Sequence, residues 1–132
     1  MSAFSNYLED ALINATLRGT TFTAPSVGSL HLALFTADPT DANLTANEVV
    51  AAWYSRKTTG SWTAPSNGVS TNVAAITFDA VTGAQVTITH LGVYDSASAG
   101  NLLYHTPLVQ SKTLDIGDVL SFAIGAVTIT LQ

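Results

Sequence analysis

Near its start the chain carries apolar side chains at the spacing of an α-helix. The stripe is formed by Tyr7, Leu8, Ala11, Leu12 and Ala15. Asn6 and Glu9 match a capping box, with Asn6 as the N-cap, and Gly19 is typical of the residue just after a helix. The sequence therefore predicts one helix at about residues 6–18, with Leu8 and Leu12 buried.

After Gly19 the period of the apolar positions changes to two residues, which predicts β-strands. Short runs rich in Val, Ile, Thr and Leu alternate with turn signals such as Pro-Ser-Asn-Gly. The predicted strands lie at about residues 30–35, 54–58, 61–64, 73–78, 86–94, 102–105, 112–114, 119–122 and 127–131. Because no helices separate them, we predict a mainly β fold: an antiparallel β-sandwich or jelly roll of about eight strands with one N-terminal α-helix, in a single domain of residues 1–132.

Two residues predict irregularities within these strands. Gly92 lies inside the longest predicted strand, where a glycine indicates a bulge or a close approach of another group. Pro107 follows the strand that begins at Leu102 and lacks the N–H that a strand ladder needs. We expect Pro107 to end that strand.

The composition limits the classes of partner. Charged residues make up 10% of the chain, hydrophobic residues 47%, and the net charge is −5 with only four Lys and Arg. Binding to nucleic acid or to an anionic membrane needs a basic patch, so we expect neither partner. A surface built mainly from Thr, Ser, Asn and Gly suits a protein that packs against other subunits.

The chain has no cysteine, which excludes disulfides, thiolate nucleophiles and cysteine-based zinc sites. Its first residues lack the basic and then apolar pattern of a signal peptide. No apolar run approaches the roughly 18 residues of a membrane span. We expect a protein made in the cytoplasm.

The motifs of catalysis do not occur in the sequence. His31, His90 and His105 lack the spacing of a metal site, although a site assembled from separate strands is the alternative to ordinary sheet histidines. Asp115 and Asp118 flank a glycine, and turn chemistry explains them better than calcium binding. With no nucleophile elbow, phosphate loop or facing carboxylate pair, we expect no enzymatic activity, no cofactor and no metal.

Aromatic residues beside an arginine indicate a protein interface. Trp53, Tyr54 and Arg56 form such a group, and together with Tyr7 on the helix they are the predicted interface residues. Closure of one end of the fold is the alternative for Trp53 and Tyr54, and it is the favoured interpretation for Trp62. A carbohydrate-binding face that uses Trp53, Tyr54 and Trp62 is a further alternative.

Motifs spread over nearly the whole chain form a recognisable set. They lie at residues 7–19, 32–41, 64–68, 90–95, 100–104 and 111–131, and include His-Leu-Gly-Val-Tyr-Asp and Gly-Asn-Leu-Leu-Tyr. The set resembles a family of short structural proteins of tailed-bacteriophage virions, often labelled tail fibre or minor structural protein. The resemblance implies a place in the virion, synthesis in the host cytoplasm, and no catalytic residues.

The position in the virion is a separate question. A long fibre is usually repetitive or coiled-coil, and this chain has neither repeats nor heptads. We therefore favour a capsid decoration or cement protein, which would contact the major capsid protein or other virion subunits as a homo-oligomer. A short tail fibre, a tail adaptor and a carbohydrate-binding module that contacts the host are the alternatives.

Overall fold

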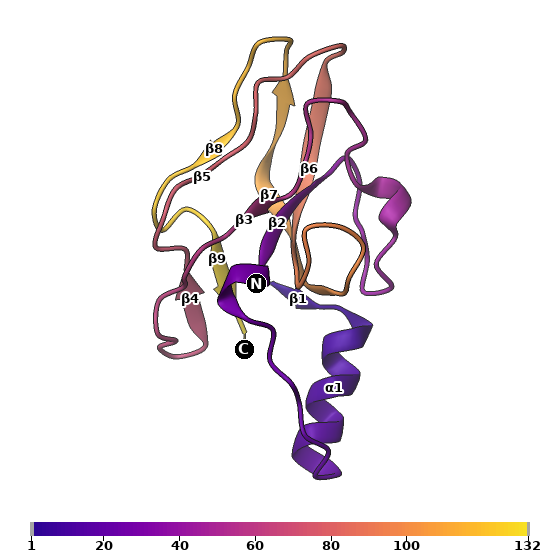
Figure 1. The fold of residues 1–132 in the computed structure, drawn as a ribbon, viewed down its shortest axis with the longest axis vertical. Helices are drawn as coiled ribbons and strands as arrows, with labels where there is room; N and C mark the ends of the chain where they lie inside the picture. Colours follow the sequence, from indigo (N-terminus) through magenta and orange to yellow (C-terminus); the bar gives the residue numbers. More distant parts are fainter. Residues whose placement is uncertain (1, 132) are drawn as a thin grey trace.

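The computed structural model describes residues 2–131 as a mainly β protein with a single α-helix (Figure 1). The helix is α1 (Asn6–Leu17), and two short 3-10 helices are η1 (Val27–Ser29) and η2 (Thr45–Asn47). The strands are β1 (Ala3–Phe4), β2 (His31–Phe35), β3 (Lys57–Thr58), β4 (Val69–Thr71), β5 (Ile76–Thr77), β6 (Val86–Tyr94), β7 (Leu102–Leu114), β8 (Ser121–Phe122) and β9 (Thr128–Thr130). Within residues 2–131 no helix is both long and apolar enough to cross a membrane.

The strands form one large sheet and two small ones. The large antiparallel sheet has the order β1-β7-β6-β2-β3, while β4 pairs with β9 and β5 pairs with β8 in two-stranded ribbons. Both ribbons lie along the same side of the large sheet (Figure 1). The prediction of a mainly β, antiparallel fold with one N-terminal helix is confirmed, and a sandwich or jelly roll of about eight strands is not.

The main hydrophobic core lies between the large sheet and the ribbons. It takes Leu32 and Leu34 from β2 and Ile76 from β5, and Leu120 and Val127 come from the segments around β8 and β9. The alternate residues of β2 are also buried, in a second small cluster on the other face of the sheet. This cluster consists of Ala33, Phe35, Tyr94 and Leu102. Strand β2 is therefore central to the fold, buried on both faces.

Strands β6 and β7 form a long hairpin whose register shifts between Ile88 and His90. Because of this bulge, Ile88 and Leu91 reach the same core although they are three residues apart. The prediction that Pro107 ends a strand is wrong, since β7 continues through it to Leu114. Pro107 is tolerated because it lies next to the bulge and beyond His105, the last residue of β7 paired with β1.

The helix begins at Asn6, as predicted, but its N-cap lies one residue earlier than predicted. Ser5, not Asn6, is the N-cap, and its Oγ accepts a hydrogen bond from Leu8 N at 3.3 Å. The Ser5 hydroxyl also donates to the carbonyl of Leu102, which ties the start of the helix to β7. Leu8 is buried as predicted, whereas Leu12 is only half-buried.

Two short strands were not predicted, and one predicted strand is largely missing. Strands β1 and β4 form because distant strands offer free edges to residues 3–4 and 69–71. The segment of residues 61–64 makes only an isolated bridge, between Trp62 and Asn72. Asn72 is fully buried, and its side chain bonds the backbone of Ala74, Ala123 and Val127, which holds the two ribbons together.

Candidate functional site

The structure does not bring the four predicted interface residues together as one exposed patch. Tyr7 is 44% exposed on α1, whereas Trp53 is buried in the main core. Arg56 has a side chain only 6% exposed, and Tyr54 is half-buried beside it. Contact of any of these residues with another protein stays a prediction, and Tyr7 is the residue placed to make one.

Arg56 is instead the centre of an internal network. Its Nε donates to Glu48 Oε1 at 2.7 Å and its Nη2 to Glu48 Oε2 at 2.8 Å, which makes a bidentate ion pair. Its Nη1 donates to the carbonyls of Ser96 at 3.2 Å and Ala99 at 2.7 Å. The Arg56 guanidinium carbon also lies 3.5 Å from the centre of the Tyr94 ring. Arg56 therefore fastens the loop between β6 and β7 to Glu48.

The loop that Arg56 fastens is closed by its own hydrogen bonds. Asn101 donates from its backbone N to Asp95 Oδ1 at 2.7 Å and from Nδ2 to Asp95 Oδ2 at 2.9 Å. Gly100 has a φ of +72°, and a Cβ there would lie 2.6 Å from Asp95 Oδ1. The motif Tyr94-Asp95 followed by Gly100-Asn101 therefore has a structural reason: it specifies this turn.

Two tyrosines complete the network around Glu48 and Arg56. Tyr54 donates from its hydroxyl to Glu48 Oε1 at 2.7 Å and accepts from Leu34 N at 3.1 Å. Burial raises the pKa of Tyr54 well above its usual value, and Glu48 adds to this. Burial also raises the pKa of Tyr94 to about 12. Burial would lower the pKa of Arg56, but its hydrogen bonds and charge pairing with Glu48 raise it, so Arg56 stays ionised.

The raised pKa values of these two tyrosines predict that the fold loses stability at alkaline pH. A group whose pKa is raised by folding stabilises the fold below its unfolded pKa and loses that contribution as the pH rises through the folded value. The free energy of unfolding should therefore fall between pH 10 and about pH 12, as Tyr94 ionises more easily in the unfolded chain. Denaturant titrations across this range would measure the fall, and Tyr94→Phe should make it shallower. An equally steep fall in Tyr94→Phe would contradict the assignment.

A second polar cluster joins two of the three histidines to two aspartates. His105 Nε2 lies 2.8 Å from Asp41 Oδ1, and His105 Nδ1 lies 3.6 Å from Asp38 Oδ1. His90 Nε2 is 4.0 Å from Asp38 Oδ2. The backbone carbonyl of Asp41 also accepts a hydrogen bond from Asn6 N at 2.8 Å. The cluster thus connects the loop after β2 with the hairpin and with the start of α1.

The metal alternatives do not gain support from this geometry. His31 does not join the cluster, since its Nδ1 lies 2.7 Å from the carbonyl of Ser29. Among residues 2–131 no group of three or more His, Asp or Glu side chains is arranged to hold a metal ion. Asp118 accepts a hydrogen bond from Asp115 N at 2.9 Å, which is the turn chemistry that the sequence favoured.

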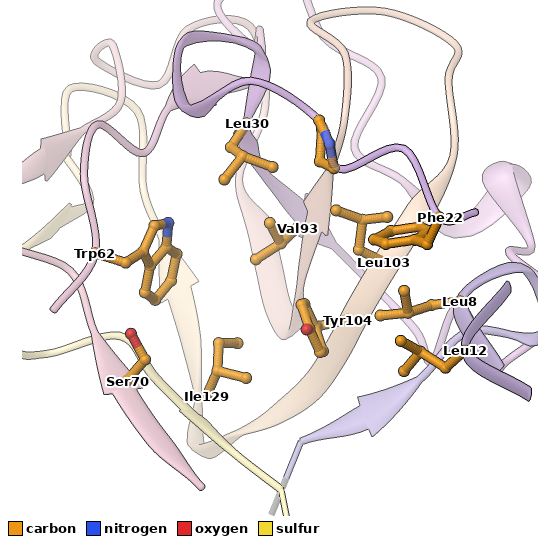
Figure 2. Close-up of a pocket in the computed structure, with 11 residues that line it drawn as sticks. Leu8, Leu12, Phe22, Leu30, Trp62, Ser70, Val93, Leu103, Tyr104 and Ile129 are labelled. Atoms are coloured by element: carbon orange, nitrogen blue, oxygen red, sulfur yellow. The ribbon is translucent and has the colours of Figure 1, made fainter. Parts of the chain in front are cut away.

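An apolar cavity of about 290 Å³ lies between α1, the segment after it and the sheet (Figure 2). Leu8 and Leu12 of α1 line it on one side, and Trp62 lies on the other. The remaining lining residues are Phe22, Pro25, Leu30, Ser70, Val93, Leu103, Tyr104 and Ile129. Trp62 Nε1 donates to Thr59 Oγ1, so this indole is held by the chain itself.

Comparison with known proteins places the chain in a family. The family model described as podophage GP4 fiber I protein gp80 matches residues 3–130. The chain belongs to this family. It is therefore a structural protein of a phage virion, as the resemblance implied, and other virion subunits are its partners. No curated protein matches the chain.

Sequence reasoning missed several residues that shape this fiber I family member. Glu48 and Tyr94 hold Arg56, and Asp38 and Asp41 hold His105. Glu48 lies only eight residues before Arg56, whereas Tyr94 and the two aspartates are far along the chain from the residues that they hold. Tyr94 belongs to the motif that carried the family resemblance, which was the one available signal. Glu48 had none beyond the rule that a buried cation needs a buried partner.

Proposed function

We propose that this chain is a subunit of the phage fibre, that it works through contacts with other virion proteins, and that it catalyses no reaction. The observation that carries the proposal is the match to a fibre protein family over residues 3–130. The polar groups of the Arg56 network support it, because they are occupied in fixing a loop and leave no free acid, base or nucleophile there.

The surface supports a role in assembly. Large apolar side chains are exposed at many places, and only 10% of the residues are charged. Uncharged surfaces lose less free energy on desolvation than ionised ones, so such a surface is suited to packing against neighbours. Glycan binding by Trp53, Tyr54 and Trp62 is not supported, since Trp53 is buried and Trp62 faces the cavity.

A capsid decoration protein is the second candidate. The observation that favours it is the sequence, which has neither repeats nor heptads. A long fibre usually has one or the other. In that position the chain would hold neighbouring capsid subunits together. Each contact could be weak, because many copies on one shell bind together with high avidity.

The two candidates differ in what a phage without this protein can do. If the chain is a fibre subunit, particles lacking it should keep DNA in the head at the same temperature as wild type but attach poorly to cells. If it decorates the capsid, heads should lose DNA at a lower temperature while attachment is normal. The copy number measured in a cryo-EM map gives an independent answer, and absence of the protein from purified virions would contradict both candidates.

A further inference from the structure

We propose that a polar pocket beside the start of α1 binds one pyranose ring of a neutral glycan. The inference goes beyond the proposed function, because it names a ligand that is not a virion protein. It is carried by the residues that line the pocket, by side-chain groups there that have one hydrogen-bonding end left free, and by an exposed tyrosine ring.

The pocket has a volume of about 190 Å³ and is lined by three segments that lie far apart in the sequence. Residues 5–7 come from the start of α1, residues 41–43 from the loop after β2, and residues 101–102 from the start of β7. Most of them carry polar side chains, unlike the lining of the apolar cavity in Figure 2. A cavity of about 150 Å³ accepts benzene, so this pocket has room for one six-membered ring with substituents.

Asn43 supplies a hydrogen-bond donor at this pocket. Its Oδ1 accepts a hydrogen bond from the hydroxyl of Tyr94 at 2.5 Å, and Tyr94 is fully buried. This bond decides which end of the amide is the oxygen, so Nδ2 carries the two N–H groups that remain. Within residues 2–131 these N–H groups have no acceptor. The donor is therefore held in place and free to bind a ligand.

Asn101 and Asp41 supply the matching acceptors. Asn101 donates from Nδ2 to Asp95 Oδ2 at 2.9 Å, which leaves its Oδ1 free among the described residues. Asp41 Oδ1 lies 2.8 Å from Nε2 of the buried His105, whereas Asp41 Oδ2 has no donor within residues 2–131. The pocket thus combines donor and acceptor groups that are already oriented, and such preorganised groups lose little entropy on binding.

The loop that carries Asp41 and Asn43 has an unfavourable backbone shape. Thr40 has a φ of +55° and Asn43 a φ of +57°, and the left-handed region is rare for a β-branched residue such as threonine. Hydrogen bonds fix this shape, from Ala42 N to Thr40 Oγ1 at 3.3 Å and from Asn43 N to the Thr40 carbonyl at 3.1 Å. Because strained backbone of this kind clusters at ligand sites, the strain supports a binding role for the loop.

The free groups of the pocket match the chemistry of a sugar ring. Hydroxyls on neighbouring ring carbons both donate and accept hydrogen bonds, so they can bind Asn43 Nδ2, Asn101 Oδ1 and Asp41 Oδ2 together. The C–H face of a pyranose is apolar and packs on an aromatic ring, and Tyr7, which lines the pocket, is 44% exposed. The carboxylate of Asp41 would repel an anionic sugar. The ligand is therefore a neutral one.

The small size of the pocket favours a sugar ring over a peptide and predicts weak binding. Peptides bind along strand edges or in extended grooves, for which about 190 Å³ is too little. A ligand of about twelve non-hydrogen atoms, bound with the efficiency of a drug-sized molecule, has a dissociation constant on the order of 1 mM. Several copies on one virion would bind a polymeric glycan more tightly, because their contacts add up.

An NMR titration of the isotope-labelled full chain with the methyl glycosides of glucose, galactose, mannose and N-acetylglucosamine tests the proposal. At least one glycoside should shift the side-chain amide signals of Asn43 and Asn101 with a common, saturable dissociation constant. Tyr7→Ala and Asn43→Asp should each weaken this binding at least about tenfold, equivalent to 1.4 kcal/mol, because one removes the ring and the other the donor. Tyr7→Phe keeps the ring and should bind like wild type.

Asn67→Asp is the matched control for Asn43→Asp. Asn67 also has a positive φ, of +51°, but it lies in the turn before β4 and does not line the pocket. The same change from amide to carboxylate at this position should leave glycoside binding unchanged. Asn43→Asp keeps the oxygen that accepts from Tyr94, so both variants should stay folded, which the dispersion of their amide spectra reports.

The outcomes separate this inference from the proposed function. Absence of a saturable shift with all four glycosides, or binding that Tyr7→Ala and Asn43→Asp leave intact, overturns the sugar site. If N-methylacetamide, a probe of the peptide group, shifts the same signals at lower concentration than every glycoside, the pocket takes a peptide and the proposal is wrong. In each of these cases a chain still present in purified virions leaves the proposed function standing.

Discussion

Arg56→Met is expected to lower the free energy of unfolding by about 3 to 5 kcal/mol, the usual loss when one partner of a buried ion pair is removed. The Glu48 carboxylate, with a side chain only 14% exposed, would be left without the guanidinium that holds it. The carbonyls of Ser96 and Ala99 would lose their donor at the same time. Chemical denaturation at neutral pH measures the effect.

Lys57→Met is the matched control for this prediction. Lys57 pairs with Asp79 at 2.9 Å, but the two side chains are 26% and 64% exposed. An exposed pair of this kind contributes at most about 1 kcal/mol. Adding Glu48→Gln to Arg56→Met should recover part of the lost stability, because it removes the unpaired charge. Equal, small losses in Arg56→Met and Lys57→Met would show that the Arg56 network does not stabilise the fold.

Gly92→Val is expected to cost about 3 kcal/mol, the upper end of the usual cost of overpacking. A Cβ at Gly92 would lie 2.7 Å from Phe35 Cε2 and 2.8 Å from Leu102 Cδ1. Both side chains are almost completely buried in the cluster around Tyr94, so they must shift to make room for the new side chain. The loss should occur although valine is the better strand residue.

Gly28→Ala supplies the comparison for Gly92→Val. A Cβ at Gly28 would meet nothing within 4 Å, and its backbone does not require a glycine. The melting temperature of this variant should be unchanged or slightly higher. If Gly92→Val melts like wild type, the close packing of Phe35 against Gly92 is wrong.

The parts of the fold that were predictable from sequence depend on local patterns. The alternation of apolar residues from Val86 to Tyr94 predicted the bounds of β6 as the structure has them. The helical stripe predicted α1 within one residue at its end. In each of these elements the apolar residues recur with the period of the secondary structure, so the element is visible in the sequence.

The parts that were missed depend on partners distant in the chain. Ser5 is held in the N-cap position by a hydrogen bond from its hydroxyl to the carbonyl of Leu102, almost a hundred residues later. Strand β7 passes through Pro107 because the bulge beside it relieves the need for an N–H. Arg56 was assigned to an exposed interface because it lies beside two aromatic residues, whereas Glu48 and the loop carbonyls draw it inward. Such pairings leave no period in the sequence.

The pairing of β1 with β7 and the hydrogen bond from Ser2 to Thr130 also limit the order of folding during synthesis. The hairpin of β6 and β7 joins residues close in the chain, so it can form early. By contrast, β1 needs His105 as a partner, and Ser2 N donates to the carbonyl of Thr130. At about 5 to 20 residues per second, the ribosome needs on the order of ten seconds to reach those partners. Until then Phe4 has no strand to pair with, and the amino-terminal segment cannot dock.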